Sequence, residues 1–230
     1  MKQIHDPNRL NMYLKKFKIK DFFDNDISDQ LRLFKFDRGE YLYSDGDYLN
    51  YFMFYVEGKA KVFSRLSNGK SLLLSFYQPL EILGDIELFN DEHVTVNVKT
   101  ITESYCVGIH IDYVRQYLTE DNKFLRFLCQ GLGNKLNRCS NNSAINLLYP
   151  LENRLASYIV AIDTKDFSES NNLTFYDSLT EISELLGTSY RHLHRTVNNF
   201  VDKGILEKSK SGYIIIDKKP LDKMANDLYS

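Results

Sequence analysis

The sequence contains no tryptophan, only four prolines and only three cysteines in 230 residues. The cysteines, Cys106, Cys129 and Cys139, are widely spaced, and none belongs to a CxxC pair. This spacing argues against a disulfide framework and against a cysteine-rich zinc site. We therefore expect reduced thiols whose role is packing.

Two further features are missing from the chain. No run approaches the roughly 18 uncharged apolar residues that a membrane span needs, and the first ten residues, MKQIHDPNRL, lack the apolar core of a signal peptide. We therefore expect a cytoplasmic protein that does not contact membranes. The chain also has no excess of one charge, with a net charge of −2, so any nucleic acid must be bound by local charge.

Residues 31–111 have an all-β pattern. Turn signals at DRG, SDGD, EG, SNGK and NDEH separate short apolar segments such as YFMFYVEG, KAKVFSRL, SLLLSFY and VTVNVKT. The SNGK turn between two of these segments predicts a hairpin. The region is predicted to form a small β-roll or barrel.

A helical pattern then runs from Asp112 to about Asn146. Its narrow apolar stripe has two interpretations, which the spacing does not separate. The helix pairs with a second copy of itself, with Gly131 and Gly133 allowing close approach, or it packs on its own barrel. In the first case the dimer interface is formed by Phe124, Leu125, Leu128, Leu132 and Leu136.

Residues 179–206, LTEISELLGTSYRHLHRTVNNFVDKGIL, predict two short amphipathic helices. Gly187 lies where the first helix must end in a left-handed residue, and Thr188 and Ser189 are candidate N-caps of the second. The following ILEKSKSGYIIID predicts a hairpin, or wing. An ordinary helical hairpin with a solvated polar face is the alternative to a DNA-binding helix-turn-helix.

The second helix carries the residue types that bind phosphates and base edges. Residues 187–219 contain seven basic and three acidic side chains, so this part of the chain is locally positive. The predicted DNA-binding residues are Thr188, Ser189, Tyr190, Arg191, His192, His194, Arg195 and Asn198.

The order of these elements resembles the Crp/Fnr family of bacterial transcription regulators. The matching segments are FDRGEYLYSDGD, VEGKAKV, ILGDIELF, LENRLASYIVAI and LTEISELLGTSYRHLHRTV. The resemblance implies an α+β fold in which residues 1–111 form a jelly-roll-like, double-stranded β-roll sensor domain with N-terminal helices, residues 112–148 a dimerisation helix and hinge, and residues 149–230 a winged helix-turn-helix domain. It also implies a homodimer that binds a two-fold symmetric DNA operator and contacts RNA polymerase.

The sensor departs from the cyclic-nucleotide pattern of that family. Gly84-Asp85 replaces the Gly-Glu that holds the ribose, and Glu92-His93 replaces the Arg-Ser or Arg-Thr that holds the phosphate. Lys99 is the only lysine or arginine between Gly84 and Thr100, so cyclic AMP is not expected to bind. Binding of an unknown small-molecule effector is the remaining alternative. Its predicted pocket is formed by Gly84, Asp85, Ile86, Glu87, His93 and Thr95.

No cofactor or metal is expected. The oxygen-sensing members of the family carry an N-terminal cysteine cluster for iron and sulfur, and no cysteine precedes Cys106. Haem ligation through His93 or His110 is not predicted. A cupin-like metal-dependent enzyme, the competing class, needs a histidine cluster that the five histidines do not provide. A third class is an effector or interaction module that does not bind DNA. We expect a regulator and no enzyme activity.

The recognition helix also departs from the family, many of whose members begin it with Arg-Glu and place an arginine four residues after the glutamate. Here those positions hold Tyr190-Arg191 and Arg195. We expect Arg195 to contact guanine and the operator to differ from the common one. The polar segment DTKDFSESNN, with Lys165 and Asp166, is predicted to be an exposed loop that contacts polymerase.

Overall fold

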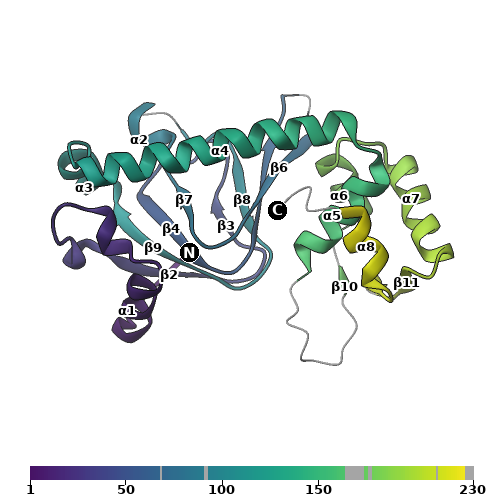
Figure 1. Ribbon diagram of the computed structural model, residues 1–230, viewed down its shortest axis with the longest axis horizontal. Helices are drawn as coiled ribbons and strands as arrows, with labels where there is room; N and C mark the ends of the chain where they lie inside the picture. Colours follow the sequence, from purple (N-terminus) through teal and green to yellow (C-terminus); the bar gives the residue numbers. More distant parts are fainter. Residues whose placement is uncertain (68, 91–92, 164–173, 176–177, 211, 226–230) are drawn as a thin grey trace. The chain divides into compact units, whose positions relative to one another are not determined.

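The computed structural model describes residues 1–67, 69–90, 93–163, 174–175, 178–210 and 212–225. It contains two compact units (Figure 1). Unit 1 comprises Met1–Val62 and Tyr77–Arg138, and unit 2 comprises Phe63–Phe76 and Cys139–Ser230. A strand-rich N-terminal part, a long helix and a C-terminal helix-turn-helix confirm the predicted fold class.

The β-roll consists of two sheets. The first has five antiparallel strands in the order β1-β2-β9-β4-β7, and the second has four in the order β3-β8-β5-β6. Strands β4 and β9, at the centre of the first sheet, are buried on both faces, which explains their nearly unbroken apolar runs. The strand bounds are Lys2–Ile4 (β1), Arg32–Phe36 (β2), Tyr41–Tyr43 (β3), Tyr51–Glu57 (β4), Ala60–Arg65 (β5), Ser71–Tyr77 (β6), Glu81–Leu83 (β7), Asn97–Thr100 (β8) and Ser104–His110 (β9).

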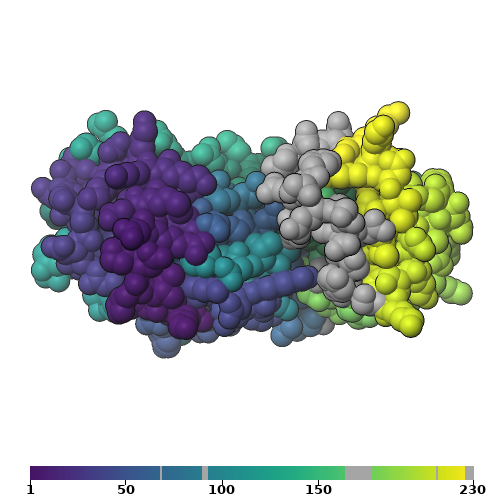
Figure 2. Space-filling view, turned by 90° about the horizontal axis from the view of Figure 1, so that it is seen from below, coloured from purple at the N-terminus to yellow at the C-terminus, as the bar shows by residue number. Residues whose placement is uncertain are grey.

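The N-terminal helix α1 (Pro7–Lys16) is attached to the roll by polar and aromatic contacts. The Arg9 guanidinium lies 3.6 Å from the ring centroid of Tyr105, and the Tyr13 hydroxyl donates a hydrogen bond to Glu57. Figure 2 shows the N-terminal residues, in purple, spread over unit 1. Two 3₁₀ helices, η1 (Ile19–Phe22) and η2 (Ser28–Gln30), lead from α1 into the roll.

The helical region after the roll is interrupted. Helix α3 (Ile111–Tyr113) continues into a π-helical segment (Val114–Leu118), and α4 (Asn122–Leu148) begins only after a turn. The prediction of one continuous helix from Asp112 is therefore wrong. The Asp121 carboxylate explains the break, because it accepts hydrogen bonds from Phe124 N at 2.9 Å and from Asp24 N at 2.8 Å and so caps α4.

The first half of α4 lies on the roll through an aromatic layer. Phe127 stacks on Phe22 with ring centroids 3.9 Å apart, and Phe124 meets Phe52 edge to face at 5.3 Å. Phe124 and Leu128 are buried completely or almost so. This face of the helix therefore belongs to the core of unit 1.

Unit 2 contains the helix-turn-helix and its wing. Strands β11 and β12 form the predicted hairpin, and β10 pairs with β12 on the other side. Helix α8, which the sequence pattern did not predict, lies beside α5 (Figure 1) and buries Leu221 and Ala225. The bounds are Leu151–Ile162 (α5), Thr174–Phe175 (β10), Leu179–Leu185 (α6), Tyr190–Asp202 (α7), Leu206–Ser209 (β11), Gly212–Ile215 (β12) and Lys218–Ala225 (α8).

Within the described part of the chain, no helix has the length and apolar character that crossing a membrane requires. The predicted polymerase loop, including Lys165 and Asp166, lies outside the described residues except for Asp163, whose carboxylate accepts a hydrogen bond from Lys218 Nζ at 2.8 Å.

Replacing the cap of α4 tests its contribution to unit 1. Asp121→Ala removes two hydrogen bonds to a nearly buried carboxylate and is expected to lower the free energy of unfolding by about 2 kcal/mol, measured in urea. The control is Asp112→Ala, at an exposed position near the same break, which we expect to change the stability by less than about 0.5 kcal/mol. Equal losses in the two variants would contradict the capping role.

Candidate nucleic-acid interface and sensor pocket

The turn between α6 and α7 has the local chemistry of a tight helix-turn-helix. Gly187 adopts a φ of +59°, the left-handed conformation that glycine reaches without strain. The Ser189 hydroxyl accepts a hydrogen bond from His192 N at 3.2 Å and caps α7, while Ser178 caps α6 in the same way. Of the two predicted caps, Ser189 is the one used.

Helix α7 separates a buried face from an exposed one. Leu193, Val197 and Phe200 are completely buried, which fixes the orientation of the helix on unit 2. The opposite face carries the predicted DNA-binding residues of the helix, and the predicted Thr188 and Ser189 directly precede it. Ser189, Tyr190, Arg191, His192, Arg195 and Asn198 are exposed, and Thr188 and His194 are half-buried.

The exposed side chains form two rows along the helix. In one row the Tyr190 and His194 rings stack with centroids 5.8 Å apart, and Asn198 Nδ2 lies 3.3 Å from His194 Nδ1. Burial raises the pKa of Tyr213 in β12, and the charge of Tyr190 in this row adds to the effect. Arg191 and Arg195, four residues apart, form the other row.

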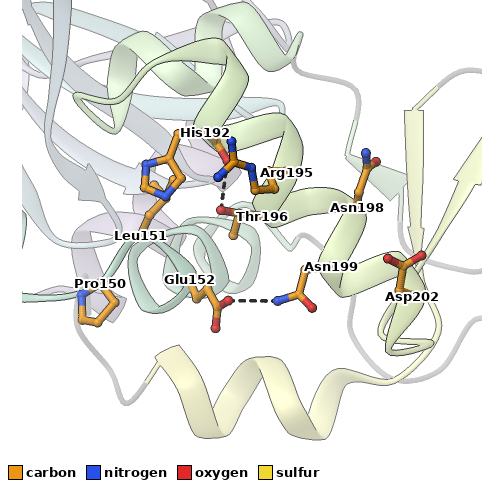
Figure 3. A pocket seen from close by; sticks show the side chains of 9 residues that line it. All are labelled: Pro150, Leu151, Glu152, His192, Arg195, Thr196, Asn198, Asn199 and Asp202. Atoms are coloured by element: carbon orange, nitrogen blue, oxygen red, sulfur yellow. Dashed lines mark hydrogen bonds between the residues drawn. The ribbon is translucent and has the colours of Figure 1, made fainter.

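Arg195 stands at a groove of about 650 Å³ between the start of α5 and the outer face of α7 (Figure 3). Asn199 Nδ2 donates a hydrogen bond to Glu152 Oε1 at 2.9 Å, which ties the two helices together. Arg195 forms no ion pair with any described residue. Its guanidinium is therefore available to a partner.

All but one of the seven basic side chains in residues 187–219 are exposed in the structure. Lys218 forms an ion pair with the buried carboxylate of Asp163 and so contributes to the internal structure of unit 2. The exposed cations of the region are Arg191, Arg195, Lys203, Lys208, Lys210 and Lys219. Such a set suits contacts to phosphates.

In unit 1, the predicted effector pocket contains a buried ion pair. Gly84 has a φ of +93°, and the next residue, Asp85, is only 2% exposed. Lys135 of α4 donates hydrogen bonds to Asp85 Oδ1 at 2.6 Å and to the carbonyl oxygen of Ile82 at 2.7 Å. The carboxylate predicted to face a ligand thus has an internal cation as its partner.

The surroundings of this pair shift several pKa values. Burial acts to lower the pKa of Lys135, but Tyr77 and Asp85 outweigh burial and the pKa is raised. Burial raises the pKa of Glu87, and the negative charge of Asp85 adds to this effect. The site therefore strongly favours a cationic Lys135 and disfavours a second negative charge beside Asp85.

The other predicted pocket residues do not join this cluster. Ile86, His93 and Thr95 are exposed, and the His93 ring lies 4.2 Å from that of Tyr48. Lys99 lies over the ring of Tyr41, with its Nζ 5.4 Å from the ring centroid. Glu92 lies outside the described residues.

Lys135 is not among the predicted pocket residues, although its position in the sequence indicates a buried partner. Lys135 lies seven residues after Leu128, on the face of α4 that is otherwise buried against the roll. A lysine within an apolar stripe needs a buried partner. Arg138 continues the same face and binds Glu81 of β7 with two hydrogen bonds.

The face of α4 predicted for a dimer needs a correction. Phe124 and Leu128 are buried by the roll itself, so they cannot contact a second copy. Leu125 and Leu132 are half-buried, and Leu136 is 71% exposed. One edge of the apolar stripe thus packs on the roll, and the other edge is exposed and remains open to a second copy of the helix.

The glycines of α4 and the three cysteines also fall into a packed group and an exposed group. A Cβ at Gly131 would lie 2.7 Å from Ile82 Cδ1, so this glycine allows α4 to approach its own roll, whereas a Cβ at Gly133 would meet nothing within 4 Å. Cys106 is buried as expected, and burial raises the pKa of its thiol. Cys129 and Cys139 are exposed on α4, which corrects the packing role expected for them.

Comparison with known proteins agrees with this arrangement. Residues 33–121 match the family model of the cyclic nucleotide-binding domain, and residues 153–224 match the Crp-like helix-turn-helix domain. Regulatory protein YeiL of Escherichia coli O157:H7 is 33% identical over 209 residues, which cover 91% of this chain and 92% of that protein. The CRP-like cAMP-activated global transcriptional regulator of Mycobacterium tuberculosis is 24% identical, over 86% of this chain and 90% of its own.

Solved structures share the fold. A CRP-family transcriptional regulator from Thermus thermophilus superposes with a TM-score of 0.67 at 17% identity, covering 86% of this chain and 98% of its own. The c-di-GMP-responsive global regulator CLP of Xanthomonas campestris has a TM-score of 0.63 at 14% identity and covers 82% and 95%, respectively.

The fold and the exposed helix α7 define a DNA-binding transcription regulator of the helix-turn-helix class. The chain belongs to the Crp/Fnr family.

The ion pair in the sensor can be tested by removing one or both partners. Lys135→Met leaves the Asp85 carboxylate buried without its cation, and we expect a loss of about 3 to 5 kcal/mol in the free energy of unfolding. Adding Asp85→Leu should restore the stability to within about 1 kcal/mol of the parent. The control Lys123→Met, at an exposed position of α4, is expected to cost less than about 1 kcal/mol. A double variant as unstable as Lys135→Met would refute this account.

Proposed function

We propose that the protein acts as a homodimer that reads a two-fold symmetric DNA operator through α7. The main support for this proposal is the exposed arginine row, because Arg191 and Arg195 lie on a helix whose other face is buried in the core. An α-helix fits the major groove, and arginine recognises guanine there through two hydrogen bonds. In a two-fold symmetric complex the half-sites are separated by about 34 Å, one turn of DNA.

Residues 1–111 serve as the sensor domain, 112–148 as the dimerisation helix and 149–230 as the DNA-binding domain. The sensor is not suited to cyclic AMP, because Lys135 is already paired with Asp85 and the sequence between Gly84 and Thr100 offers no arginine for the phosphate. The mycobacterial relative described as cAMP-activated therefore does not predict the effector here. RNA polymerase is proposed as a further partner on the family likeness alone.

The open edge of α4 supports the dimer. Leu125, Cys129, Leu132 and Leu136 are spaced by four, three and four residues, the spacing of a coiled-coil seam. Leu136 and Cys129 are exposed in the single chain, whereas the adjacent side of the helix holds Lys135 in the roll. A parallel copy of the helix would cover this seam.

Selection of binding sites from random DNA tests the reader. The parent is expected to select a two-fold symmetric sequence, and Arg195→Ala to lose about 1 to 3 kcal/mol of discrimination at one base pair of each half-site. The control is Lys203→Ala, at an exposed cation that follows α7, which we expect to weaken all sequences alike and to reduce the salt dependence. Unchanged preference at every position in Arg195→Ala would exclude the assigned contact.

A charge on the open edge of α4 tests the dimer. Leu136→Glu places two carboxylates across the symmetry axis, and light scattering should then show the mass of one chain, 26.9 kDa, where the parent shows twice that. Asn134→Glu, which adds the same charge at an exposed position of α4 off the seam, should leave the dimer intact. Dissociation by both variants, or by neither, would speak against this seam.

A further inference from the structure

Unit 2 contains a second cavity, of about 350 Å³, beside the turn of the helix-turn-helix. Four segments of unit 2 line it. They are β6 with Leu72 and Leu74, the last part of α4 with Leu147 and the polar Asn142, Ser143 and Asn146, α5 with Arg154, and the turn with Leu186 and Gly187. A Cβ at Gly187 would lie 3.6 Å from Leu72 Cδ1, so the turn and β6 lie within van der Waals distance of each other. The cavity is thus mainly apolar and touches the DNA-binding element.

Arg154 of α5 supplies a cation to this apolar wall. Its Nη1 donates a hydrogen bond to the carbonyl oxygen of Leu186 at 2.5 Å, whereas its Nε is buried and has no hydrogen-bond partner. No described carboxylate forms an ion pair with Arg154. A buried donor without a partner is costly, and an anion is the natural acceptor for a guanidinium.

We propose that this cavity binds a small amphipathic carboxylate. The carboxylate accepts a hydrogen bond from the Arg154 guanidinium, and the apolar body lies against Leu72, Leu74 and Leu147. A volume of about 350 Å³ lies in the range of small-molecule sites, and a mainly apolar lining with a few polar groups is their usual composition. The site is separate from the sensor pocket around Asp85, which belongs to unit 1.

The geometry couples this ligand to DNA binding. Arg154 holds the carbonyl of Leu186, the residue just before the left-handed Gly187 that starts the turn into α7. A ligand bound to the same guanidinium changes the free energy of this contact, and DNA affinity changes by the same factor as ligand affinity. This coupling, unlike the binding itself, rests on the proposed function.

The binding test uses the full chain, calorimetry and three probes. Octanoate has the charge and the apolar body, 1-octanol has the body without the charge, and acetate has the charge without the body. The parent should bind one octanoate per chain at least tenfold more tightly than either 1-octanol or acetate. Failure to bind octanoate, because the cavity is covered by a second copy or for any other reason, overturns the proposal, as does equal affinity for octanoate and 1-octanol.

Variants assign the binding to this cavity. Arg154→Gln should lose the tenfold preference for octanoate over 1-octanol and keep the affinity for 1-octanol. Because Arg154 also binds Leu186, the second variant is Leu74→Trp, which fills the cavity, retains Arg154 and should abolish binding of both probes. Leu148→Trp adds the same ring at an exposed position that does not line the cavity and should bind octanoate like the parent. Parent-like octanoate binding by Leu74→Trp would place the ligand elsewhere and overturn the proposal.

A mobility shift with selected DNA, with and without octanoate, tests the coupling separately. We expect octanoate to change the DNA affinity of the parent and not that of Leu74→Trp. A parent that binds octanoate without any change in DNA affinity keeps the site and overturns the coupling. If the parent binds octanoate and no DNA, the proposed function fails and the ligand site stands.

Discussion

The attachment of α4 to the β-roll is the constraint on which the rest of unit 1 depends. Phe124 and Phe127 anchor the start of the helix in an aromatic layer, and Lys135 continues the same face into the sensor, where it neutralises Asp85. A buried carboxylate without this cation would be strongly unfavourable. The helix therefore places the charged group of Lys135 in the predicted effector pocket. The orientation of the helix also leaves Leu136 exposed.

In unit 2 the corresponding constraint is the buried face of α7. Leu193, Val197 and Phe200 fix which side of the helix is exposed, and Ser189 and Gly187 fix where it begins. The wing completes the domain, with β11 and β12 paired in a regular register. Because the apolar face leaves the helix no rotational freedom, the two arginines of α7 are presented as a fixed row, as recognition of a groove requires.

Features that depend on residues close together in the sequence were easier to predict than features that depend on residues far apart. The helix-turn-helix, its Gly187 turn and the wing were predictable, because caps, left-handed glycines and apolar spacing act over a few residues. The break before α4 was missed although part of its signal is local, since Asp121 accepts a hydrogen bond from Phe124 N three residues ahead. The second hydrogen bond of this carboxylate, from Asp24 N, joins residues 97 positions apart. Helix α8 was missed for a similar reason, since its stability derives from packing of Leu221 and Ala225 in unit 2.

The sequence by itself determined the family, the fold class and the exposed face of the recognition helix, since these follow from local patterns and their order along the chain. Only the tertiary structure decided how side chains distant in sequence are paired. It showed that Lys135 reaches Asp85, that Phe124 is buried against the roll, and that Arg154, which lines a cavity of unit 2, has a buried Nε without a hydrogen-bond partner. These are long-range contacts, and their partners are set by packing and charge in three dimensions.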